Sequence, residues 1–92
     1  MRVGKVIGAV VSTAKNEALT GAKLLVVAPV DGTEEPLVAV DTVGAGRGEV
    51  VLVATGSAAR MVTMTQQAPV DAAIVAIVDR LETDGWTSYQ KD

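Results

Sequence analysis

Short apolar runs recur along the chain, and turn-forming glycine, proline and aspartate separate them. The runs are rich in valine and bounded by turn signals, a pattern typical of β-strands. We therefore predict five main strands, at Arg2–Thr13, Lys23–Val30, Leu37–Val43, Glu49–Thr55 and Ala72–Leu81. A short final strand at Trp86–Tyr89 is predicted after the turn Asp84-Gly85.

One of these runs, Ala72–Leu81, is ambiguous, because its apolar spacing also suits a helical face. The density of β-branched residues favours a strand, and the rest of the chain supplies partners for it. Between the strands, Asp31–Pro36 is predicted as a loop and Met61–Ala68 as an extended or irregular surface segment. Gly56-Ser57 can open a short helical turn, with Ser57 as its N-cap.

The pattern predicts an all-β fold, mainly strand with one short helix, in a single domain over residues 1–92. Five strands joined by short loops indicate a small Greek-key or OB-like barrel. Gly4 and Gly8 lie inside the first strand, where glycine often marks a bulge or bend. Several strands are apolar on both faces, so the outside of the barrel needs a cover, and a second copy is the economical one.

Composition removes several function classes. The 92 residues carry a net charge of −3 and no basic cluster, which argues against nucleic acid as a partner. Cysteine and histidine are absent, so the sequence offers no thiolate site, no imidazole general base and no cofactor or metal site. No apolar run approaches the roughly 20 residues of a membrane span. We expect a soluble, cytoplasmic protein with no membrane partner.

Glycine occupies every second position in the loop before the fourth strand, at Gly44, Gly46 and Gly48. A phosphate-binding glycine loop leads into a helix, whose N-terminus meets the phosphate. Here the glycines lead into Glu49–Thr55, which has a strand pattern, and no Gly-Lys-Ser/Thr ending is present. We interpret this loop as a tight connection with positive φ and close backbone contact between subunits.

Carboxylates also interrupt or flank the apolar runs, at Asp41, Asp71 and Asp79. An acid–base pair would need a pocket and perturbed environments. We therefore interpret these side chains as turn, capping and interface hydrogen-bonding groups.

Arg60 follows Gly-Ser-Ala-Ala and could bind an anion or a carboxylate. A salt bridge to Glu49, or to an aspartate of a neighbouring copy, is the favoured interpretation. Trp86 and Tyr89 could form a stacking platform for the bases of single-stranded nucleic acid. In an acidic chain they are better interpreted as covering a barrel end or an interface.

An ordered set of segments covers nearly the whole chain: Gly4–Gly8, Val10–Thr13, Gly21–Leu25, Ala39–Gly46 with Gly48-Glu49, Gly56–Arg60 and Pro69–Asp79. This set resembles the EutN/CcmL family, the vertex proteins of bacterial microcompartment shells. The departures are small: Thr42 stands where the family usually has Asn, Val50 where Trp is common, and Ala58 where Ser is common.

The resemblance implies a five-stranded OB-like barrel, with Ala72–Val78 as a strand, that forms a homopentamer. Such pentamers close the five-fold corners of a polyhedral shell, whose facets are hexamers or pseudohexamers of a different fold. A flat hexagonal layer cannot close without such corners.

The expected subunit-interface or axial residues lie in two loops and one strand-flanking position. They are Gly44, Gly46, Gly48, Glu49, Gly56, Ser57, Arg60 and Asp71. The alternative function is an OB-like binding module for a small ligand or an oligonucleotide. An enzyme would need a pocket with convergent polar groups, which these residues do not provide.

Overall fold

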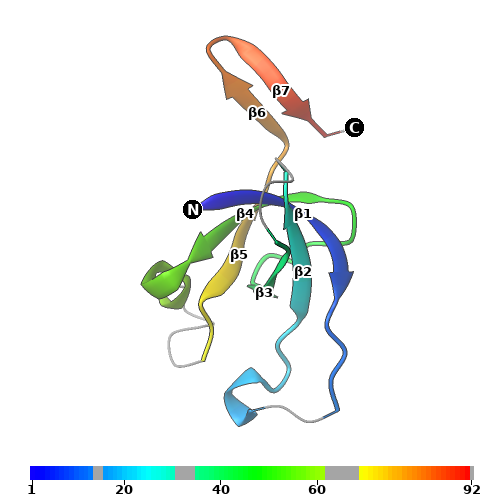
Figure 1. Ribbon diagram of the computed structural model, residues 1–92, viewed down its shortest axis with the longest axis vertical. Coiled ribbons are helices and arrows are strands. Elements are labelled where there is room, and N and C mark those ends of the chain that lie inside the picture. Colours follow the sequence, from blue (N-terminus) through cyan, green and yellow to red (C-terminus); the bar gives the residue numbers. More distant parts are fainter. Residues whose placement is uncertain (14–15, 31–34, 62–68, 92) are drawn as a thin grey trace.

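The computed structural model describes residues 1–13, 16–30, 35–61 and 69–91, and its seven strands form a barrel and a separate hairpin (Figure 1). The barrel strands are β1 (Arg2–Ala9), β2 (Leu24–Pro29), β3 (Leu37–Asp41), β4 (Val50–Thr55) and β5 (Ala72–Ile77). The hairpin strands are β6 (Arg80–Thr83) and β7 (Trp86–Gln90). Two 3₁₀ helices, η1 (Glu17–Leu19) and η2 (Gly56–Arg60), lie in the connections.

The barrel closes in the order β1-β2-β3-β5-β4 and confirms the predicted five-stranded OB-like fold. Strand β3 pairs with β5 in parallel, and the other neighbouring pairs are antiparallel. Because the sheet closes on itself, every barrel strand has a neighbour on both sides. The five predicted strands are the five barrel strands, with ends that differ by up to four residues.

The two glycines in β1 mark a close approach of backbones and a bulge, and the bulge was predicted from the sequence. A Cβ on Gly4 would lie 2.9 Å from the carbonyl oxygen of Ala28, so only glycine fits this close approach of β1 to β2. The register between these strands shifts between Val6 and Gly8, which marks a bulge. Strand β1 ends at Ala9 rather than the predicted Thr13, because its partner β2 begins only at Leu24.

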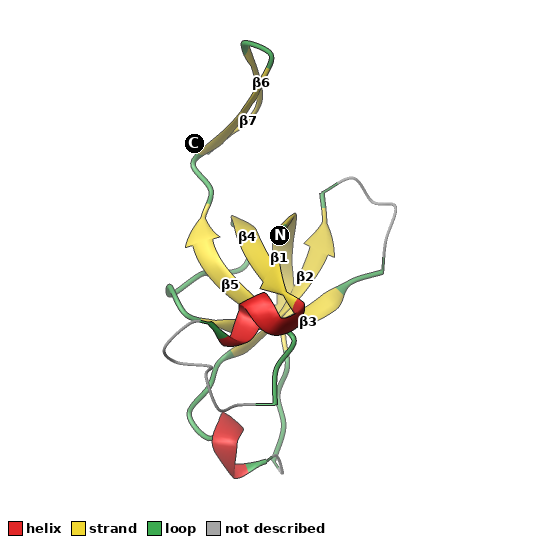
Figure 2. Cartoon of the chain, turned by 90° about the vertical axis from the view of Figure 1, so that its left-hand side faces the viewer, coloured by secondary structure: helices red, strands yellow, loops and turns green. Residues whose placement is uncertain are grey.

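The core fills the inside of the barrel with small branched side chains. Its buried members are Val6, Leu25, Val27, Ala39, Ala45, Val51, Val53, Ala72 and Ile74. Part of the outer face is also buried within one chain, because η2 packs against β4 and β5 (Figure 2). Ala54 and Ala73 on those strands are almost fully buried, as is Ala59 of η2. The predicted outer cover is therefore supplied partly by the chain itself.

The predicted strand Ala72–Leu81 is wrong in its extent. Strand β5 ends at Ile77, where its partner β4 begins, and the backbone N–H of Val78 makes one further bond, to Val50. The chain then leaves the barrel, and Leu81 belongs to β6. Strand β7 at Trp86–Gln90 confirms the short final strand, and it pairs with β6 rather than with the barrel.

The helical turn at Gly56 is present, but Ser57 is not its N-cap. Thr55, the last residue of β4, occupies that position and makes no side-chain capping bond. The turn is a 3₁₀ helix that follows β4 directly. Helix η1 lies between β1 and β2, and the side chain of Asn16 caps it by accepting a bond from the N–H of Ala18. Of the predicted surface segment Met61–Ala68, residues 62–68 lie outside the described part of the chain, as do residues 31–34.

Candidate assembly interface

The glycine loop between β3 and β4 is organised by one buried carboxylate. Asp41 is 7% exposed, and its Oδ1 accepts bonds of 3.1 Å from the N–H groups of Val43, Gly44 and Ala45. Its Oδ2 lies 3.8 Å from Nζ of Lys23, which donates to the carbonyl of Ala45 at 2.8 Å. The predicted turn-capping role of Asp41 is confirmed. The loop is a packed part of the barrel, with Ala45 in the core.

Two of the three loop glycines adopt backbone angles that other residues avoid. Gly44 has a φ of 81° and Gly48 a φ of 90°, whereas Gly46 has no positive φ. Gly46 instead donates its N–H to Oε1 of Glu49 at 2.7 Å. The loop leads into strand β4 and not into a helix, so the geometry of a phosphate-binding loop is absent.

Glu49 joins the glycine loop to the end of the described chain. Its Oε2 accepts a 2.8 Å bond from Nζ of Lys91, which follows β7. The bond from Lys91, reinforced by the N–H of Gly46, lowers the pKa of the Glu49 carboxyl below its ordinary value. The same bond raises the pKa of Lys91. Of the two partners predicted for Arg60, Glu49 is therefore wrong within one chain, because Lys91 holds this carboxylate, and an aspartate of a neighbouring copy stays a prediction.

The remaining candidate residues gather at η2. The N–H of Gly56 donates to the carbonyl of Asp71 at 2.7 Å, and Nη1 of Arg60 donates to the carbonyl of Val70 at 3.3 Å. Gly56 has a φ of 64°, which explains its residue type. Ser57, Arg60 and Asp71 are exposed, so their side chains are available to a second molecule.

The structure thus divides the candidate residues into two groups and does not bring them together. The glycine loop precedes β4 and η2 follows it, so they lie at opposite ends of a six-residue strand. At about 3.3 Å per residue the separation is about 20 Å. This separation is a second reason why Arg60 forms no salt bridge with Glu49 of the same chain. In a cyclic ring the interface joins two different surfaces of the protein, so two separate groups are compatible with one interface.

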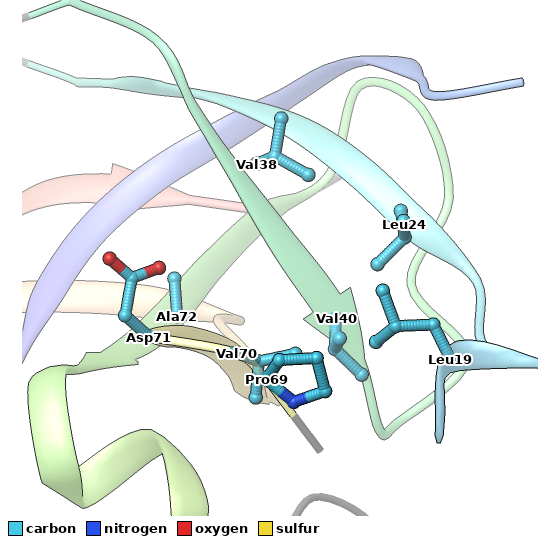
Figure 3. Close-up of a pocket in the computed structure, with 8 residues that line it drawn as sticks. All are labelled: Leu19, Leu24, Val38, Val40, Pro69, Val70, Asp71 and Ala72. Atoms are coloured by element: carbon cyan, nitrogen blue, oxygen red, sulfur yellow. The ribbon is translucent and has the colours of Figure 1, made fainter. Parts of the chain in front are cut away.

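An apolar groove of about 190 Å³ lies beside the η2 group and is lined by η1, by β2 and β3, and by the residues that lead into β5 (Figure 3). Its lining residues are Leu19, Leu24, Val38, Val40, Pro69, Val70, Asp71 and Ala72. Val38 is 47% exposed although it lies on a strand of the closed barrel. Among the described lining residues, Asp71 is the one titratable group. The described part of the groove is therefore mainly an apolar contact surface.

A hairpin formed by β6 and β7, here called the arm, stands away from the barrel (Figure 1). The barrel and the arm together extend 45 Å along the longest axis of the molecule and 24 Å across it. Trp86 on the arm is 76% exposed, so it does not cover a barrel end within one chain, and the alternative that it covers an interface stays a prediction. The separate arm and the Lys91 link were missed from the sequence. The Asp84-Gly85 turn, a strong hairpin signal, could have revealed the arm.

In the described residues, no group of three acidic side chains is placed to hold a metal ion. Within the same residues, none of the helices has the length and apolar character needed to cross a membrane.

A family model described as "Ethanolamine utilisation protein EutN/carboxysome" matches residues 1–79. The chain belongs to the EutN/CcmL family. This EutN/CcmL chain is 55% identical over 89 residues to the bacterial microcompartment shell vertex protein GrpN of Rhodospirillum rubrum (strain F11). The match covers 90% of this chain and 98% of GrpN.

Solved structures of two relatives share the fold. The carboxysome shell vertex protein CcmL of Nostoc sp. PCC 7120 is 45% identical, with a TM-score of 0.92 over 99% of this chain and 100% of CcmL. GrpN from Rhodospirillum rubrum, described as a pentameric microcompartment shell protein, is 53% identical, with a TM-score of 0.74 over 90% of this chain and 98% of that one. The EutN/CcmL chain is accordingly a structural protein, a pentameric vertex component of a bacterial microcompartment shell.

Proposed function

We propose that the chain closes the five-fold corners of the shell through two kinds of contact. Five copies meet one another through the glycine loop, the η2 group and the arm. The outer rim of the ring then docks against hexameric or pseudohexameric shell proteins. The role is purely structural, with no catalytic step at either surface.

The arm is the observation that carries the self-assembly proposal. An isolated two-stranded hairpin is marginally stable in water, and its strands each leave one edge unpaired. Among the described residues, the strands of the arm make extensive contacts only with each other. The arm also carries an exposed tryptophan, Trp86. A neighbouring copy in the pentamer would bury this apolar surface and complete the environment that the arm lacks.

The η2 group supplies the second contact. Gly56, Ser57 and Arg60 form an exposed edge held to Asp71 and Val70 by backbone acceptors. The apolar groove adjoins this edge and offers a surface that excludes water when covered. Arg60 donates Nη1 to the backbone carbonyl of Val70, and its guanidinium has further donors for a carboxylate of a neighbouring copy.

The proposed η2 contact can be tested by adding bulk at an exposed position. Ser57→Trp places a large side chain on η2, and we expect it to convert pentamers into smaller species without unfolding the barrel. Glu17→Trp is the matched control, because Glu17 is also exposed and lies on the other 3₁₀ helix. Sedimentation velocity measures both. A pentamer that is unchanged in Ser57→Trp would contradict the assignment of η2 to the interface.

The proposed docking to shell tiles is tested by co-expression with a hexameric shell protein of the same compartment. With this chain present, electron microscopy should show closed polyhedral particles, because a hexagonal layer needs five-fold corners to close. Without it, open sheets or tubes are expected. Closed particles of equal number in both cases would remove the proposed vertex contact.

A further inference from the structure

The base of the arm is hydrogen-bonded to the barrel at two consecutive residues, Glu49 and Val50, where strand β4 begins. The N–H of Val78 donates to the carbonyl of Val50 at 2.8 Å, and Nζ of Lys91 donates to Glu49 at 2.8 Å. The arm closes on itself just beyond, where the N–H of Lys91 donates to the carbonyl of Asp79 at 2.6 Å. The arm therefore leaves the barrel from a short base beside the start of β4.

Only one of these connections between arm and barrel runs through side chains. The Glu49 carboxylate divides its oxygens between two parts of the chain, Oε1 to the N–H of Gly46 and Oε2 to Lys91. Its side chain is 24% exposed and is therefore partly shielded from water, whereas that of Lys91 is 42% exposed. The carboxylate thus links a rigid loop, whose conformation Asp41 fixes, to the end of the arm.

We infer that Glu49 is a positioning residue for assembly, whose carboxylate sets the direction in which the arm leaves the barrel. The bond between Val78 and Val50 is one backbone contact, about which the arm can pivot. A second contact, from the far strand of the arm, removes that freedom. The consequence for the pentamer rests on the proposed function, whereas the restraint on the arm is a property of a single chain.

The charges around the link act in consistent directions. Lys23 also favours the ionised form of Glu49, and Asp79 and Tyr89 favour the charged form of Lys91. Within the described residues the arm carries a further ion pair, between Arg80 and Glu82, with Nε and Oε1 at 3.3 Å. Both partners of that pair belong to β6 and are about 60% exposed, so it does not link the arm to the barrel.

The experiment compares hydrogen exchange of the arm amides, residues 80–90, in the whole chain and in three variants. Lys91→Gln removes the ammonium, Lys91→Arg retains a cation, and Arg80→Gln breaks the pair that lies within the arm. We expect arm exchange about two- to fivefold faster in Lys91→Gln, the range of a modest surface ion pair, with near-normal exchange in Lys91→Arg. Arg80→Gln should leave the exchange unchanged, and barrel amides should be unaffected throughout.

Sedimentation equilibrium of the same proteins separates this inference from the proposed interface. Faster arm exchange in Lys91→Gln with a weaker pentamer supports both. Faster exchange with an unchanged pentamer supports the restraint and overturns its role in assembly. Unchanged exchange, or equal acceleration in Arg80→Gln, overturns the restraint itself. A chain that forms no pentamer at all would refute the proposed interface, while the exchange comparison in the monomer would still decide whether Glu49 restrains the arm.

Discussion

The barrel and the arm are both built from paired β-strands, yet they differ in what stabilises them. Barrel side chains such as Ile74, Val51 and Val53 are at most 1% exposed, and each barrel strand has two neighbours. In the arm each strand has one neighbour, and Trp86 lies 76% exposed. The difference shows that the chain combines a barrel whose core is buried within one copy with a hairpin that leaves its tryptophan exposed, as is typical of a segment of low stability in isolation.

The largest expected effect lies in the barrel core. Ile74→Ala removes a fully buried side chain from the closed barrel and leaves a cavity, so the free energy of unfolding should fall by about 2–5 kcal/mol. Denaturant unfolding of the chain measures this. The conservative variant Ile74→Val should cost about 1 kcal/mol. Equal, negligible losses in both variants would contradict the interpretation of the barrel as the stabilising module.

A smaller loss is expected at the carboxylate that organises the glycine loop. Asp41→Ala leaves three backbone N–H groups without their acceptor, and we expect a loss of about 2 kcal/mol. Asp41→Asn is the control, because its amide oxygen can still accept these bonds, and it should lose less. Thermal unfolding followed by circular dichroism distinguishes them. Asn and Ala variants of equal stability would show that the capping bonds contribute little.

Backbone conformation in the same loop gives the next effect. Gly48→Ala forces a side chain into a φ of 90°, at a cost of about 1–2 kcal/mol. Gly8→Ala is the matched control, because Gly8 has no positive φ and a Cβ there would meet nothing within 4 Å. Chemical denaturation of the two variants gives the comparison. A cost at Gly8 that equals the cost at Gly48 would refute the role of positive φ.

The arm should show the opposite behaviour. Trp86→Ser should change the free energy of unfolding of the barrel by less than about 0.5 kcal/mol, because the side chain is exposed. It should nevertheless weaken the pentamer measurably in dilution experiments. Val11→Ser, at a position that is 94% exposed outside the proposed contacts, should change neither quantity. A destabilised barrel with an unchanged pentamer would reverse the assigned roles of the two regions.

The smallest effect is the pH dependence of the arm link. Because the pKa of Glu49 is lowered in the folded chain, the link contributes above the unfolded pKa and is lost as pH falls through the folded one. Fluorescence anisotropy of Trp86 should therefore distinguish the unmodified chain from Lys91→Gln at neutral pH. The difference should vanish well below pH 4.5, the ordinary pKa of a glutamate. A difference that persists in strong acid would contradict the link.

The barrel could be predicted from the sequence because the residues that mark its strands and turns lie within those strands and turns. Valine-rich runs and turn signals place β2, β3 and β4 to within two residues at either end. The break after Ile77 could not be read from the pattern, because Val78 is also apolar and β5 ends only where its partner β4 begins. A strand end set by a partner elsewhere in the chain leaves little local signal.

The candidate interface was predicted less well, because its contacts join distant parts of the chain. Arg60 and Glu49 are close in sequence, yet β4 separates them in space, and Glu49 pairs with Lys91 instead. By contrast, the turn role of Asp41 was predicted correctly, since its bonds run to residues two to four positions further on. Which surfaces face a neighbouring copy depends on a second chain and stays a prediction.

Native mass spectrometry of the full chain, beside a chain that ends at Asp79, tests the division between barrel and arm most directly. The account predicts a pentamer for the full chain, and a folded monomer with an intact barrel for the chain without its arm. A shortened chain that forms the same pentamer at the same concentration would contradict the proposed role of the arm in assembly.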